Sequence, residues 1–151
     1  MSISQGLADL AQARFMHYFS QPFECLIRLY LAKTFFWAGL SKVDDWSATL
    51  ALFSDEYHVP LLSPSLAAWS ASAAELLLPV LLAAGCLKRL AALALFMVNG
   101  VAVLAYYHVL RDMPAALQDH VEWGLMLLAL AAWPGPHWNV AQWIGPRQQV
   151  A

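Results

Sequence analysis

The fold is decided by residues 90–110, which read LAALALFMVNGVAVLAYYHVL. This stretch contains no Asp, Glu, Lys or Arg, and its strongly polar side chains are Asn99 and His108. A helix of about 20 mainly apolar residues crosses a bilayer, whereas hydrocarbon would leave the backbone groups of an open strand unpaired. The stretch therefore predicts a transmembrane helix.

Three further segments are long enough to cross a bilayer. They run from Pro22 to Leu40, from Leu66 to Leu87 and from Pro114 to Trp133. The last one carries His120 and Glu122 in its outer turns, which a helix packed into a bundle tolerates. We therefore predict an all-α fold, an integral membrane four-helix bundle with short amphipathic helices at the N-terminus and in the periplasmic loop.

The amino-acid composition is typical of an integral membrane protein. Hydrophobic residues make up 61% of the 151 residues, charged residues 12%, and the mean hydropathy is +0.56. Soluble domains average about 45–50% apolar and about 25% charged residues, so this chain has too little charge for a water-facing surface. The net charge of −2 and the absence of a basic tract argue against nucleic acid as a partner.

The predicted organisation has three parts. Residues 1–20 mix apolar and polar side chains and form an amphipathic cytoplasmic or interfacial segment, residues 21–140 form the transmembrane domain, and residues 141–151 form a cytoplasmic tail. The loop from Ser41 to Ser65 contains an amphipathic stretch around Trp46 to Phe53.

The basic residues predict the orientation in the membrane. One side, which holds both termini, carries four of them: Arg14, Lys88, Arg89 and Arg147. The other side carries Lys42 and Arg111 among several acids. Because cytoplasmic flanks are enriched in Lys and Arg, we predict a multi-pass protein of the bacterial inner membrane with both termini in the cytoplasm.

Lys33, Glu75 and Asn99 form the predicted polar interior. Each lies about ten residues from the cytoplasmic end of its helix, or about 15 Å deep. An unpaired charge at this depth costs from about 2.5 kcal/mol upward, so Lys33 and Glu75 are predicted to face each other inside the bundle. Two interpretations stay open. The residues form a structural ion pair, or they bind a proton, a quinone headgroup or a small substrate.

Glu24 and Arg28 are four positions apart and share a helix face. They are predicted to pair and extend to the headgroups, and the alternative is that Arg28 presents a cation to an anionic ligand. Cys25 and Cys86 have no CxxC spacing and are predicted to be small buried hydrophobes rather than a thiol pair.

His108, His120 and Glu122 are the candidates at the outer face. Two imidazoles near a carboxylate could ligate haem iron, copper or zinc, but histidines at helix ends are more often ordinary interfacial residues. We therefore expect no metal site, and neither haem nor copper as a cofactor. No CxxCH, HExxH or glycine-rich phosphate loop is present, and no catalytic residue can be assigned.

Several short motifs together resemble the DoxX family over about residues 22–140. They are Arg28 followed by the Gly39-x-x-Lys42 turn, Glu75 before Leu76-Leu77-Leu78-Pro79, the hairpin Gly85…Lys88-Arg89, and His120-Val-Glu122-Trp123 followed by Trp133-Pro-Gly-Pro. The family pattern commonly ends in Gly-Pro-Gly-aromatic-Ser-hydrophobic-Asp. This chain has Asn139 in place of the Ser and Ala141 in place of the Asp.

The resemblance implies a four-helix inner-membrane protein in a redox or metal-stress context. One branch of the family is the small subunit of thiosulfate:quinone oxidoreductase, and other short members occur beside enzymes that modify metal-binding, cysteine-rich peptides. We expect an accessory protein that binds a quinone or a small redox ligand among Arg28, Lys33, Glu75 and Asn99, with a membrane or periplasmic redox partner. A quinone-linked oxidoreductase subunit and a small transporter or export helper for a metal-binding product remain as alternatives.

Overall fold

The structure, a computed structural model, describes residues 3–133, with side chains from Phe19 onward. This part of the chain is helical and contains no strand. Its elements are α1 (Ile3–Asp44), α2 (Trp46–Asp55), α3 (Pro64–Ala84), α4 (Lys88–Leu110) and α5 (Pro114–Ala132). The predicted tail and the terminal motif with Asn139 and Ala141 lie outside the described residues.

The observed helices agree closely with three of the four predicted spans, and the stretch around Trp46 to Phe53 forms α2 as expected. The first helix is much longer than its predicted span. It begins at Ile3 rather than at Pro22 and continues through that proline. A proline removes one backbone hydrogen bond and bends a helix, but it does not have to end one. No break therefore separates the N-terminal segment from the first span.

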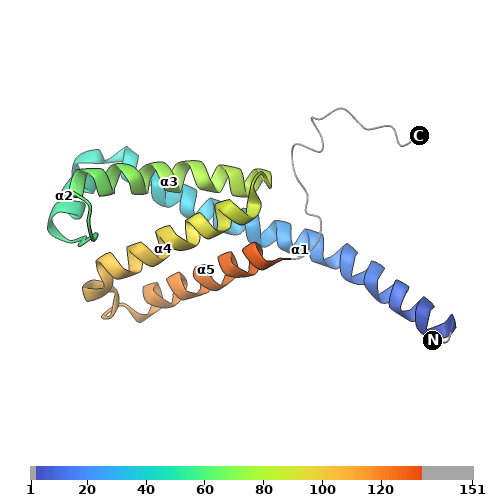
Figure 1. The fold of residues 1–151 in the computed structure, drawn as a ribbon. Coiled ribbons are helices and arrows are strands. Elements are labelled where there is room, and N and C mark those ends of the chain that lie inside the picture. The colour runs from blue at the N-terminus through green and yellow to red at the C-terminus, as the bar shows by residue number, and fades with distance from the viewer. Residues whose placement is uncertain (1–2, 134–151) are drawn as a thin grey trace, which may run out of the picture.

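The four long helices form an antiparallel bundle in which α1 packs on α3, α3 on α4, α4 on α5, and α5 on α1. Figure 1 shows that α1 extends past the others toward the N-terminus, and that α2 covers the opposite end of the bundle. We call these the hairpin end, where the α3–α4 turn lies, and the α2 end. Gly85 closes the hairpin in a left-handed conformation (φ 71°), which a residue without Cβ adopts without strain.

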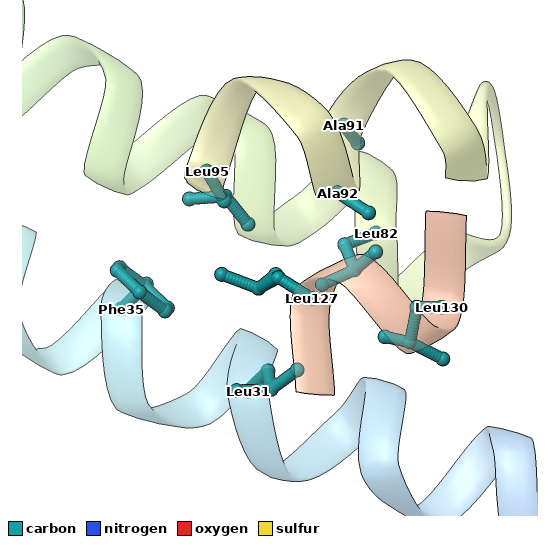
Figure 2. Close-up of a cluster of buried hydrophobic side chains, with 8 residues drawn as sticks. All are labelled: Leu31, Phe35, Leu82, Ala91, Ala92, Leu95, Leu127 and Leu130. Carbon is teal, nitrogen blue, oxygen red and sulfur yellow. The ribbon is translucent and has the colours of Figure 1, made fainter. Parts of the chain in front are cut away.

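The apolar core lies between the hairpin end and the middle of the bundle. Its buried side chains come from all four long helices and point toward one another in Figure 2: Leu31, Phe35, Leu82, Ala91, Ala92, Leu95, Leu127 and Leu130. The outside of the bundle also carries many exposed large apolar side chains, as a bilayer-facing surface does. Two helices, α3 and α4, are long and apolar enough to cross a membrane.

Asp45 separates α1 from α2 and caps the shorter helix. Its Oδ1 accepts hydrogen bonds from the Ala48 N–H and the Ser47 hydroxyl, both at 2.9 Å. These bonds favour the charged form, so the pKa of the carboxyl group lies below its ordinary value of 3.8. The contribution of the cap is therefore fully present above pH 3.8 and is lost as the pH falls through the depressed value.

We expect acidification below that pKa to fray the first turn of α2 while the four long helices persist. Hydrogen exchange of the α2 amides, compared between wild type and Asp45→Asn at the same pH, measures this effect. Asparagine caps a helix without titrating, so the variant should keep its protection in acid. Equal fraying in both proteins would show that the Asp45 carboxylate is not responsible.

Candidate functional site

An ion pair between α1 and α3 lies inside the bundle. The Nζ of Lys42 is 2.6 Å from Oε2 of Glu75, and their side chains are 17% and 9% exposed. Gly39, one turn before Lys42, allows the close approach of the two helices. A Cβ atom at Gly39 would lie 2.9 Å from the backbone carbon and the Cβ of Glu75. The glycine and the lysine of the Gly-x-x-Lys turn therefore both serve to position Glu75.

The predicted pair between Lys33 and Glu75 is wrong. Lys33 is exposed on the outer face of α1, and Glu75 pairs with Lys42 instead. Each residue turns an α-helix by about 100°, so Lys33, two positions before buried Phe35, points to the opposite side. Lys42 follows Phe35 by seven positions and therefore shares its inward face. The two residues that a midplane transport site would need are thus separated.

Asn99 connects α4 to α5 through His120. Its Nδ2 donates to the backbone carbonyl of His120 at 2.9 Å, and its Oδ1 lies 2.7 Å from Nδ1 of the same residue. Because a carbonyl can only accept, the amide nitrogen must face it, and Oδ1 must accept from the ring. In a neutral imidazole this bond places the proton on Nδ1 and leaves Nε2 as a hydrogen-bond acceptor.

Two cavities meet at the ion pair. One has a volume of about 320 Å³, the other about 260 Å³, and five residues line both: Lys42, Tyr57, Glu75, Val98 and Ala102. The larger cavity is mainly apolar and reaches the surface of α4, since its lining includes the exposed side chains of Met97 and Val101. The smaller cavity is lined by Asn99 and His120. A mainly apolar cavity thus adjoins one whose lining contains several polar side chains.

Tyr57 lines both cavities near the α2 end. It lies in the connection between α2 and α3, and its ring packs edge-on against Phe53 and Tyr106 at 4.8 and 4.7 Å between centroids. Burial, with a smaller effect of Tyr106, raises the pKa of the Tyr57 phenol above its usual value of 10.0. The hydroxyl group therefore remains protonated and can donate a hydrogen bond.

A second buried polar cluster lies at the hairpin end. Oε1 of Glu24 is 3.7 Å from Nη1 of Arg28 and 3.3 Å from Nζ of Lys88. The predicted Glu24–Arg28 pair is confirmed, but the expectation that it extends to the headgroups is wrong. Glu24 is 1% exposed, and Arg28 and Lys88 are each 3% exposed. Sequence reasoning did not connect Lys88 with this pair, because it assigned Lys88 and Arg89 together to a basic hairpin on the cytoplasmic side. The cluster joins α1 to the start of α4.

The remaining candidates have separate surroundings. His108 is exposed and packs against His58, with 5.3 Å between ring centroids, whereas His120 bonds to Asn99. Glu122 is exposed and accepts a hydrogen bond from Gln118 at 2.8 Å. In the described part of the chain, no three His, Cys, Asp or Glu residues gather as metal ligands. Cys25 and Cys86 are half-buried and form no disulfide, and the Sγ of Cys25 accepts a weak hydrogen bond from Arg28 at 3.8 Å.

These features define an α-helical membrane bundle with a buried ion pair and two adjoining cavities beside it. Comparison with known protein families identifies the family to which this bundle belongs. The DoxX family model matches residues 24–108, more than half of the chain, and the chain belongs to this family of membrane proteins. The matched range extends from Glu24 to His108 and contains Lys42, Glu75 and Asn99. A search of the curated proteins found no match, and a search of the solved structures found none.

Proposed function

We propose that this DoxX protein is an accessory protein of the bacterial inner membrane that binds an isoprenoid quinone in its two joined cavities. The observation that carries the proposal is the junction at Lys42 and Glu75, where a mainly apolar cavity adjoins one that is lined in part by polar side chains. A quinone has the same division, with an apolar tail and a ring that bears two oxygen atoms. Binding sites for small molecules are typically apolar clefts with a few well-placed polar groups.

The larger cavity fits the entry of a lipid-soluble ligand. Met97 and Val101 are exposed on α4, one of the helices that can cross the membrane, so the cavity opens toward the region that acyl chains occupy. A ligand dissolved in the bilayer can enter there without passing through water. The apolar residues of this cavity would contact the tail, and the smaller cavity would receive the ring.

The smaller cavity offers both a donor and an acceptor to the ring. The Lys42 ammonium can donate to a quinone oxygen, and Nε2 of His120 can accept from a quinol hydroxyl. Glu75 holds Lys42 in place through their ion pair. A bound quinone would supply two-electron, two-proton redox chemistry. The chain itself would bind and orient the ring and hold a proton at His120, while a membrane or periplasmic redox partner exchanges the electrons.

The test is to purify the protein in mild detergent, extract it with organic solvent, and measure quinone per chain. We expect stoichiometric quinone in the wild type. In Ala102→Phe, the new ring fills the junction of the two cavities, so the quinone content should fall to background. Leu104→Phe is the matched control, since Leu104 is exposed on the same helix and lines neither cavity. Wild-type protein without quinone, or equal quinone in both variants, would contradict the proposal.

A further inference from the structure

The outer face of α1 carries a lysine in the middle of an apolar stripe. Lys33 lies on this face, and its neighbours at helical spacing are all exposed large apolar residues: Leu26, Leu29, Tyr30, Phe36, Trp37 and Leu40. This part of α1 packs along α3, a helix that can cross the membrane. The stripe therefore faces the interior of the bilayer.

Lys33 has neither an ion pair nor a hydrogen bond to any described residue. It follows Glu24 by nine positions and precedes Lys42 by nine, a distance of about 14 Å along the helix to each. A lysine side chain cannot span that distance, so Lys33 cannot extend to either polar cluster. A cation that faces lipid at this depth is unfavourable unless a partner covers it.

Glu122 is an exposed acid at a similar height on the neighbouring helix α5. Its chain neighbour Trp123 packs against Phe35 of α1 with 6.0 Å between ring centroids, and the Trp123 Nε1 lies 3.4 Å from the Tyr30 hydroxyl. Tyr30 and Phe35 flank Lys33 in the sequence. Glu122 forms a hydrogen bond with Gln118 but no ion pair with a described residue. One copy of the chain thus exposes a cation and an anion at nearly the same depth.

We propose that two copies form a dimer in the membrane through the outer faces of α1 and α5, with Lys33 of each copy paired to Glu122 of the other. A two-fold axis along the membrane normal keeps every residue at its own depth, so side chains at one depth can meet across it. Such an interface is self-complementary, and the Lys33–Glu122 contact occurs twice. The pairing covers both unmatched charges, and the apolar stripe supplies the packing around them.

Charge reversal in separate copies tests this pairing. Two differently tagged copies are co-expressed, one with Lys33→Glu and the other with Glu122→Lys, and their association is measured in detergent and in lipid nanodiscs. Each variant alone would face like charges at both contacts and should dimerise at least about tenfold more weakly than the wild type. The mixed dimer restores two opposite-charge contacts, so the two variants should associate with each other and not with themselves.

The mixture distinguishes a contact between copies from one within a copy, because an ion pair inside one chain would not be restored by mixing. Arg89→Glu, an exposed charge reversal at the hairpin end, should leave dimerisation unchanged. The neutral variants Lys33→Gln and Glu122→Gln provide a second measurement if a reversed copy does not fold. Each neutral variant should weaken the dimer. A chain that carries both changes should dimerise only slightly more weakly than either single variant. A monomeric wild type, or mixed copies that fail to associate, would overturn the proposal.

Discussion

Replacing Lys42 with Met or Glu75 with Gln is expected to lower the free energy of unfolding by about 3 kcal/mol, at the lower end of the range for a broken buried ion pair. Each change leaves the other member of the pair without its partner at 2.6 Å, at a position where both side chains are largely buried. The double variant Lys42→Met/Glu75→Gln should recover most of this loss, because no uncompensated charge remains. Thermal unfolding in detergent measures all three effects.

Lys33→Met is the matched control for this comparison of the single and double variants at Lys42 and Glu75. It removes the same functional group from the same helix, but Lys33 is exposed and Glu75 pairs elsewhere. We expect no coupling between Lys33→Met and Glu75→Gln, since changes at sites without shared contacts are additive within about 0.5 kcal/mol. Strong coupling to Lys33 and none to Lys42 would show that Glu75 has a different partner from the one observed.

The same variants separate the structural role of the ion pair from its proposed role in ligand binding. Lys42 and Glu75 line both cavities, so a stable double variant would still lack the donor proposed for the quinone ring. Recovered stability with lost quinone would assign the pair to the binding site. If the double variant recovered its stability and also kept its quinone, the ion pair would be only a structural contact between α1 and α3.

The helices were largely predictable from the sequence because apolar length alone identifies a membrane span. The partner of Glu75 was not predictable from depth, because depth ignores which way a side chain points. Lys33 and Glu75 were matched by their distance from the helix ends. The seven-residue spacing of Arg28, Phe35 and Lys42 indicates a common face, and it would have excluded Lys33.

The cluster at the hairpin end was missed for a different reason. In the sequence, Lys88 and Arg89 both belong to the basic hairpin on the predicted cytoplasmic side, yet Lys88 is buried against Glu24 and Arg89 is exposed. Two adjacent residues at the start of a helix point about 100° apart, so their surroundings can differ completely. The predicted spans place Glu24 and Lys88 at the same end of the bundle, but the sequence does not show that their side chains face each other.

His120 was predicted to lie at the outer face beside His108, but its partner is Asn99. The two histidines flank one turn, which suggested a shared environment. The first turns of α5 instead bring His120 to the inner side of the bundle, where the amide of Asn99 accepts its Nδ1 proton. A contact of this kind depends on the rotation of two helices about their axes, and one sequence does not determine that rotation.

Gly39→Ala is expected to destabilise the protein by about 1–3 kcal/mol, as overpacking of a buried contact does. The added Cβ would lie 2.9 Å from the backbone of Glu75, so α1 and α3 must separate or shift, and the ion pair one turn away must lengthen. Alanine favours a helix over glycine by up to about 1 kcal/mol, which offsets only part of the loss. Thermal unfolding in detergent and quinone content should therefore both fall.

Gly100→Ala provides the control for that substitution. Gly100 lies within α4, and a Cβ atom there would meet nothing within 4 Å. The helix propensity of alanine then acts alone, so stability should rise by up to about 1 kcal/mol. The two substitutions make the same chemical change with opposite expected signs. If Gly39→Ala were as stable as Gly100→Ala, the close approach of α1 to Glu75 would not be what positions the ion pair.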